Sequence, residues 1–167
     1  MPIQKILVYP NPFLNQKTQP VDHIENVDIQ TLIDDMIETM LEYGGVGLAA
    51  NQIGIDKSII VYDQTEGKTD TRVLINPEIT EKSTSMQKSK EGCLCIPGLF
   101  IPINRYTKIK VKGYTREGIK IDLEAETQLA NILQHEIDHL NGILFVDRLS
   151  KIQRQVFRKR LRRIKKF

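Results

Sequence analysis

The sequence lacks tryptophan and has only two cysteines, Cys93 and Cys95, in 167 residues. Two cysteines cannot build a disulfide framework, and one residue apart in a strand they would point to opposite faces, which argues against a mutual disulfide. No stretch approaches the roughly 20 apolar residues of a membrane-spanning helix, so no membrane partner is expected. The first residues contain no apolar core of a secretory signal. We therefore expect a reduced, cytoplasmic protein.

Length and composition set the domain organisation. Hydrophobic residues make up 40% and charged residues 27% of the chain, which are ordinary values for a globular protein. A chain of this length can bury a substantial core without the support of disulfides or structural metal ions. We expect residues 1–167 to form a single domain.

The net charge of +3 hides an asymmetry. Residues 151–167 contain nine Lys/Arg and no acid, which leaves 15 Lys/Arg against 21 Asp/Glu in residues 1–150, a net charge of −6. A basic terminal block is typical of an arm that binds a polyanion, usually a nucleic acid. A solvated helix whose charges only keep it soluble fits the composition equally well.

Three segments have the apolar spacing of helices. Residues 28–43 repeat apolar side chains at helical intervals and end at Gly44-Gly45. Residues 125–140 end at Asn141-Gly142, which is a C-cap signal. A final helix begins near Lys151, and in it we expect Ile152, Val156 and Leu161 to be buried.

The predicted strands lie between the first two helices. They comprise residues 58–63, followed by a polar loop through Glu66-Gly67, and residues 73–77, which end at a proline. Residues 108–114 and 119–123 alternate polar and apolar side chains around a turn and predict an antiparallel hairpin with one wet face. The sequence thus predicts an α+β fold: antiparallel β-sheets around a central helix, with a C-terminal helix.

The most informative motif lies on the predicted helix 125–140. His135-Glu136-Ile137-Asp138-His139 is an H-E-x-x-H pattern, and residues four apart on a helix share one face. Both imidazoles can therefore reach one metal ion. Glu136 then lies beside that ion, where it can accept a proton from a metal-bound water.

A catalytic metal ion bound by two histidines usually has a third protein ligand. The zincin continuation H-E-x-x-H-x-x-G-x-x-H fails because Phe145 occupies the position of the last histidine. The only acid after His139 is Asp147, so the third ligand is expected upstream. Cys93 is the best candidate, because Gly92 before it permits a close backbone approach and a thiolate is a strong ligand. Cys95 could serve instead, and His23 is the remaining competitor.

A glycine-rich segment, residues 44–52, joins the first predicted helix to a strand. Three glycines in four residues permit a substrate to lie against the backbone, although a tight structural turn explains them equally well. The segment is not a phosphate-binding loop, since it lacks the G-x-x-x-x-G-K-[ST] pattern. Beside a metal, Gln52 could donate a hydrogen bond to a developing oxyanion.

These segments together resemble the three signature motifs of the bacterial peptide deformylases. The motifs are Gly45-Val46-Gly47-Leu48-Ala49-Ala50-Asn51-Gln52, Glu91-Gly92-Cys93-Leu94-Cys95 and Gln134-His135-Glu136-Ile137-Asp138-His139, in matching order and approximate spacing. The resemblance extends through most of the chain.

The resemblance implies a function and a set of roles. Cys93, His135 and His139 would bind one divalent ion, iron(II) in many members, with zinc, nickel or cobalt as alternatives. Glu136 would transfer protons, and the Gln52 amide and Leu94 N–H would stabilise the oxyanion. The reaction would be removal of the N-formyl group from formyl-methionine of nascent peptides. The substrate-binding residues would be Val46, Gly47, Gly92 and Ile132.

Some positions depart from the family pattern. Cys95 stands where serine is usual, and Phe100 falls where some members have arginine, so recognition beyond methionine is expected to be more apolar. Gln128 and Asn131 lie on the motif helix where some members have aliphatic residues, which leaves the width of the methionine pocket open. A ribosome-associated protein without catalysis would need a damaged motif, and none of the key positions is damaged. In this family a C-terminal helix can dock on the ribosome, which favours ribosomal RNA as the partner of residues 151–167.

Overall fold

The computed structural model describes residues 2–65 and 70–164. The predicted loop through Glu66-Gly67 lies outside these residues. The helices are α1 (Val27–Glu42), α2 (Thr127–Leu140) and α3 (Lys151–Ile164), with 3-10 turns η1 (Pro12–Asn15), η2 (Ala50–Ile53) and η3 (Phe145–Arg148). The strands are β1 (Gly47–Ala49), β2 (Ile59–Asp63), β3 (Thr71–Lys82), β4 (Met86–Cys93), β5 (Ile96–Tyr106), β6 (Lys108–Tyr114) and β7 (Lys120–Glu126).

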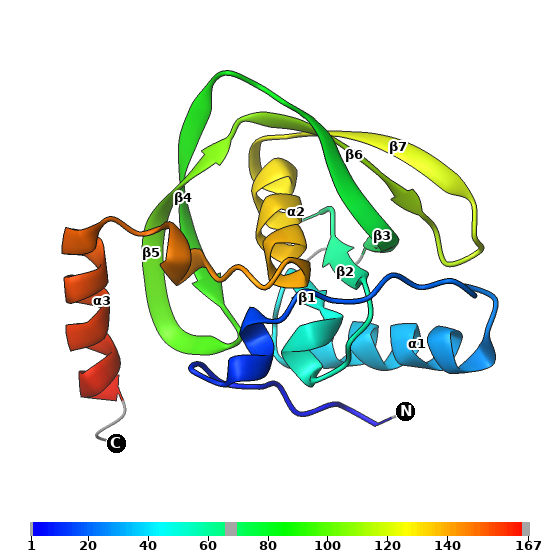
Figure 1. Cartoon of the computed structure of the whole chain (residues 1–167), viewed down its shortest axis with the longest axis horizontal. Coiled ribbons are helices and arrows are strands. Elements are labelled where there is room, and N and C mark those ends of the chain that lie inside the picture. The colour runs from blue at the N-terminus through cyan, green and yellow to red at the C-terminus, as the bar shows by residue number, and fades with distance from the viewer. Residues whose placement is uncertain (1, 66–69, 165–167) are drawn as a thin grey trace.

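Two antiparallel sheets surround helix α2, which confirms the predicted α+β class (Figure 1). The larger sheet has the strand order β1-β2-β3-β6-β7, and the smaller one is the hairpin β4-β5. The predicted hairpin of residues 108–123 forms β6 and β7, with Val111 opposite Leu123. Helix α1 lies below the large sheet in the view of Figure 1, and α3 lies apart from α2, beside β5.

Strand β2 shows how the larger sheet packs against α1 on one face and α2 on the other. Its five residues are all buried, and successive side chains point to opposite faces. Ile59 and Val61 join the core that contains Met36 and Met40 of α1, while Ile60 and Tyr62 join the core under α2. The sheet is therefore a central layer between two apolar cores, and α2 is held rigidly on one of its faces.

Strand β3 does not end at Pro77, and that prediction was wrong. The strand continues to Lys82 through a bulge between Ile75 and Glu78. Asn76 adopts a positive φ of 52° there, and its side-chain amide bonds both the N–H and the C=O of Val21. The bulge removes Pro77, which has no N–H, from the ladder, so pairing with β6 resumes beyond it.

Helix α3 forms where it was predicted but buries a different face. Ile152 is 76% and Val156 45% exposed, whereas Phe157 is 3% exposed. Phe157 packs edge-on against Tyr9, with ring centroids 5.8 Å apart, and Leu161 is only partly buried. The prediction was wrong for Ile152 and Val156, because docking on Tyr9 and β5 buries the stripe that contains Phe157, and Leu161 packs against the same core.

Candidate metal centre and active site

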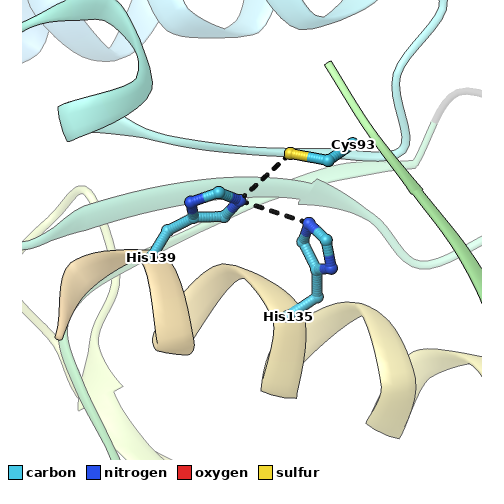
Figure 2. A group of neighbouring side chains, drawn as sticks. All are labelled: Cys93, His135 and His139. Carbon is cyan, nitrogen blue, oxygen red and sulfur yellow. Dashed lines mark hydrogen bonds between the residues drawn. The ribbon is translucent and has the colours of Figure 1, made fainter. Parts of the chain in front are cut away.

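Helix α2 presents His135 and His139 side by side on one face (Figure 2). The helix is buried from Ala130 to Leu140, because the two sheets cover it from different sides. The Nε2 atoms of the two histidines lie 3.2 Å apart. The predicted i, i+4 geometry of the motif is therefore present in the structure.

Cys93 approaches these histidines from the end of β4. Its Sγ lies 3.3 Å from His139 Nε2, and the ligand atoms of all three residues lie within 4.8 Å of one another (Figure 2). Cys93 pairs with Ile96 across a tight turn formed by Leu94 and Cys95, so the two cysteines are not alternate residues of one strand as the sequence suggested. Both are free thiols. His23 is exposed and pairs with Glu25, which removes it as a ligand candidate.

The three side chains have the spacing that one ion requires. Ligands at about 2.0–2.3 Å from a tetrahedral ion stand roughly 3.3–3.6 Å apart. The separations of His139 Nε2 from Cys93 Sγ (3.3 Å) and from His135 Nε2 (3.2 Å) are close to that range. Burial, followed by the positive charges of His135 and Arg105, lowers the pKa of His139 well below its usual value and keeps its imidazole neutral. A thiol and two imidazoles suit iron(II), zinc, nickel and cobalt alike.

Glu91 orients the first of these histidines. Its Oε1 lies 2.7 Å from His135 Nδ1, which directs Nε2 of the ring toward Cys93 and His139. Burial opposes ionisation of Glu91, but hydrogen bonds from Arg105 and His135 outweigh it and lower the pKa of Glu91 to about 2. Glu91 is thus a permanent carboxylate, and it fixes the tautomer and angle of a histidine ring that could bind a metal ion.

Arg105 connects Glu91 to the motif helix. The guanidinium is 2% exposed and bonds both carboxylate oxygens of Glu91, at 2.7 and 2.8 Å. It also donates to Asp138 at 2.6 Å, and Asp138 in turn accepts two bonds from Arg148. This buried network ties β4, β5 and α2 together behind the histidines.

The motifs of the sequence do not predict this network, although the pattern of β5 contains one signal of it. Arg105 continues the alternating run Leu99, Ile101, Ile103 on the buried face of β5. A charged residue at a core position requires a buried partner of opposite sign. Which of the 21 acids supplies the partner depends on the fold.

Glu136 lies in the site without a partner for one of its oxygens. The side chain is buried, and its Oε2 has no hydrogen-bond partner among the described residues. Burial raises the pKa of Glu136 to about 7. A Cβ at Gly47 would lie 2.5 Å from Glu136 Oε1, so only glycine permits this approach of β1 to the carboxyl group. A carboxyl group with a pKa near neutrality can both accept and return a proton.

Gln52 and Leu94 lie beside Cys93, on a 3-10 helix and a turn respectively. Gln52 belongs to η2 and is 1% exposed; its Oε1 accepts the Ala49 N–H at 2.7 Å, and its Nε2 lies 3.6 Å from Cys93 Sγ. Leu94 is the first residue of the turn after Cys93, and its side chain packs against Gly45.

A cavity of about 810 Å³ opens onto these groups, which is the size of a ligand pocket. All four predicted substrate-binding residues line it: Val46, Gly47, Gly92 and Ile132. Gln52, Cys93, Leu94, His135 and Glu136 face the same cavity. Gln128 and Asn131 also line it, and Phe100 covers Gly92 at its rim, 58% exposed.

A group of side chains that could hold a metal ion, beside a buried carboxyl group and a cavity of ligand size, is the arrangement of a metal-dependent hydrolase. The polypeptide deformylase family pattern matches residues 3–155, and the chain belongs to that family. Enzymes of this family remove the N-formyl group from the N-terminal formyl-methionine of newly synthesised polypeptides and release formate, and this is the reaction of the chain.

Individual relatives support the assignment over nearly the whole chain. The chain is 43% identical to a peptide deformylase of Stutzerimonas stutzeri, covering 98% of this chain and 97% of that protein. It is 46% identical to one of Bartonella quintana, with 99% and 95% covered. The crystal structure of a peptide deformylase from Legionella pneumophila superposes with a TM-score of 0.91 at 41% identity, covering 99% of this chain and 96% of the other.

Proposed function

We propose that Cys93, His135 and His139 are the protein ligands of the catalytic ion, and that iron(II) is the ion used. A divalent ion held there acidifies a coordinated water and polarises a carbonyl oxygen. The single observation that carries the proposal is the convergence of the three ligand atoms within 4.8 Å, with Glu91 directing one of the rings. The same set suits zinc, nickel and cobalt, so metal analysis of protein purified without oxygen, with activity measured in parallel, tests the identity of the ion.

Glu136 is the proton-transfer residue of this proposal. It takes the proton of the attacking water and returns it to the leaving amine, a double role that its pKa of about 7 permits. The Gln52 side-chain amide and the Leu94 backbone N–H donate hydrogen bonds to the oxygen of the formyl group as negative charge develops on it. Gln52 belongs to η2, and Leu94 belongs to the turn that follows Cys93.

The substrate lies in the cavity beside these groups. Val46 and Ile132 contact the methionine side chain, and the backbones at Gly47 and Gly92 accommodate the peptide. Phe100 at the rim offers an exposed ring to the residues after methionine, so apolar side chains are preferred there.

The variant Glu136→Ala tests the proton-transfer role. We expect it to retain one metal ion per chain and to lose formate release from formyl-Met peptides by about 100-fold or more, the range for a general base. The matched control is Glu117→Ala in the exposed turn between β6 and β7, which should leave both quantities unchanged. Full activity of Glu136→Ala would refute the mechanism.

A second pair of variants tests the ligand set. Cys93→Ser should lose or weaken metal binding, because a neutral hydroxyl replaces a thiolate ligand. Cys95→Ser should keep the metal. The assignment is wrong if Cys95 proves to be the thiol that the metal needs.

We further propose that residues 1–167 act as one catalytic domain in the cytoplasm and that α3 binds ribosomal RNA. Within residues 2–65 and 70–164, no helix combines the length and apolarity needed to cross a membrane. Among the described residues 151–164, seven lysines and arginines are exposed on α3, and none of the fourteen residues is acidic. Such a surface favours phosphate contacts.

Charge reversal separates docking from catalysis. Arg158→Glu with Arg162→Glu should weaken ribosome binding in a salt-dependent manner while turnover of small formyl peptides stays the same. Reversal of exposed Lys120 on β7 is the control. Unchanged ribosome affinity in the α3 variant would leave this helix a solubility feature.

A further inference from the structure

The amide of Gln52 is shared by two thiols. Its Nε2 lies 3.3 Å from Cys95 Sγ and 3.6 Å from Cys93 Sγ, both within reach of an N–H···S hydrogen bond. Cys93 lines the catalytic cavity, whereas Cys95 is fully buried and lies outside its lining. Cys95 therefore contacts the amide from the core side and Cys93 contacts it from the side of the site.

The hydrogen bond to the oxygen of this amide determines which of its two ends faces the sulfur atoms. Gln52 Oε1 accepts the Ala49 backbone N–H at 2.7 Å, so the reverse rotamer would place the NH₂ group against another donor. The NH₂ group must consequently face the two sulfur atoms. The NH₂ group has two N–H donors, which is enough for one to reach Cys95 on the core side and the other to reach Cys93 on the side of the cavity.

The N-terminal segment fixes Gln52 and Cys95 relative to each other. The Leu7 N–H donates to the carbonyl oxygen of Gln52 at 2.8 Å, and the Tyr9 N–H donates to that of Cys95 at 2.9 Å. Segment 7–9 thus bonds the backbones of η2 and of the β4–β5 turn. Together with the bond from Ala49 to the side chain of Gln52, these two backbone bonds keep the amide close to the Cys95 thiol.

We infer that Cys95 is a positioning residue, which holds the Gln52 amide so that its second N–H is directed at the formyl oxygen. This role rests on the proposed function of Gln52 as an oxyanion donor. The Cys95 sulfur accepts one N–H and thereby restricts rotation of the side chain about its last torsion. The geometry gives this residue a task in catalysis that requires no contact with the metal or the substrate.

Three substitutions at Cys95 separate positioning from packing. Cys95→Ala and Cys95→Val both remove the acceptor, but alanine leaves a cavity and the slightly larger valine does not. Both should lower kcat by about 5- to 20-fold, a fraction of the roughly 100-fold or greater loss for a missing oxyanion donor. Cys95→Ser keeps an acceptor and should retain at least half of the parent kcat. KM should change less than twofold in all three.

A purely structural role predicts the opposite order. Valine would then be tolerated, and serine, which places a hydroxyl in an apolar core, would be the damaging change. Thermal unfolding of each variant accompanies the kinetics, so that a loss of folding is distinguished from a loss of rate. A kcat that tracks stability, or one that stays normal in Cys95→Ala, overturns the inference.

Two further readouts isolate Gln52. In a Gln52→Ala background, Cys95→Ala should have no additional effect on kcat, because both changes remove the same interaction. In metal-free protein, the side-chain NH₂ resonances of Gln52 should shift and exchange faster in Cys95→Ala and should stay near the parent values in Cys95→Ser. Unshifted resonances in Cys95→Ala would contradict the inference whatever the activity.

The variants Gln52→Ala and Cys95→Ala together show whether the positioning role of Cys95 fails or the proposed function of Gln52 fails. If Gln52→Ala is fully active, the oxyanion role itself fails. If Gln52→Ala is impaired and Cys95→Ala is not, only the positioning role of Cys95 fails.

Discussion

Gly47 shows how closely the backbone approaches Glu136, the residue that we propose as the proton-transfer group. A Cβ at this position would lie within 2.8 Å of three atoms of Glu136, all of them in a side chain that is itself buried. A Cβ at position 47 would therefore push the Glu136 carboxyl group away from its place beside the two histidines. The small residue is therefore required by the location of Glu136, in addition to any role in binding the peptide.

Gly47→Ala should lower kcat by about tenfold or more, since a shift of about 1 Å in a catalytic group has effects of that size. Formate release from a formyl-Met peptide measures the loss. In a Glu136→Asp background, whose shorter side chain relieves the contact, the added penalty should shrink. An equal penalty in both backgrounds would mean that the clash with Glu136 is not the cause.

Tyr62 lies in the core under α2, and its ionisation makes the stability of the folded protein depend on pH above 10. Burial raises the pKa of Tyr62 to about 12 from 10. The folded protein thus holds a proton that the unfolded chain releases, so its contribution is complete below pH 10 and is lost as the pH rises from 10 toward 12. At 1.36 kcal/mol per pKa unit, the contribution is about 2–3 kcal/mol.

Tyr62→Phe should therefore flatten the decline of stability above pH 10, as measured by urea unfolding across pH 9–12. Absorbance of the parent protein should show one tyrosine that ionises after the others. The same slope in the variant and the parent would assign the decline to other groups, such as lysines.

At the scale of elements, the buried ion network is the link between the hairpin β4–β5 and α2. Arg105 donates to Glu91 on β4 and to Asp138 on α2, and both carboxylates are almost completely buried. Removing the cation leaves two buried charges without compensation, which is more damaging than losing an exposed pair.

Arg105→Met should destabilise metal-free protein by about 3–5 kcal/mol in urea unfolding. Lys112→Met, which removes an exposed pair with Glu78, is the control and should change stability by less than about 1 kcal/mol. The variant should also bind metal roughly 10- to 100-fold more weakly, because Glu91 no longer holds His135 firmly. If Arg105→Met lowered the free energy of unfolding no more than Lys112→Met does, the buried network would not be what stabilises the fold.

The elements differ in how far the sequence predicts them. Helices α1 and α2 and the hairpin β6–β7 were predicted because their apolar periodicity and end signals agree. Strand β3 was cut short at Pro77, since a bulge that removes a proline from the ladder depends on the side chain of Asn76 and its bonds to Val21. The buried face of α3 depends on Tyr9, a contact across 148 residues that periodicity cannot reveal.

The site follows the same division. The i, i+4 spacing predicts that His135 and His139 face one point, and the structure places Cys93 beside them. Glu91 and Arg105 were missed because their roles arise only when β4, β5 and α2 meet. The contact between Cys95 and Gln52 likewise depends on the turn after Cys93, which the strand interpretation of residues 93–95 did not allow.

At the scale of the whole molecule, the site joins three parts of the chain that are distant in sequence. The glycine-rich loop, the β4–β5 turn and α2 each supply part of it, and only the complete fold brings them together (Figure 1). Binding of an ion by Cys93, His135 and His139 should therefore stabilise the entire domain, since the unfolded chain has no such site.

Metal binding should also release protons, because the ligands are a thiolate and neutral imidazoles. The neighbouring Cys95 thiol, and after it burial, raises the pKa of the Cys93 thiol well above its usual value, so metal-free Cys93 is protonated at neutral pH. Each bound ion must displace that proton. Affinity should therefore rise with pH, by up to about tenfold per unit for each proton displaced.

Calorimetry with zinc as the probe, in two buffers of different ionisation enthalpy, counts the released protons. We expect at least about one per ion at pH 7.5 for the parent, and about one fewer for Cys93→Ala, whose remaining ligands are the histidines. Zinc at 1,000 times its dissociation constant should stabilise the parent by about 4 kcal/mol, which thermal unfolding detects. Equal proton release from the parent and Cys93→Ala would mean that the thiol is not a ligand, and the centre would then need another third donor.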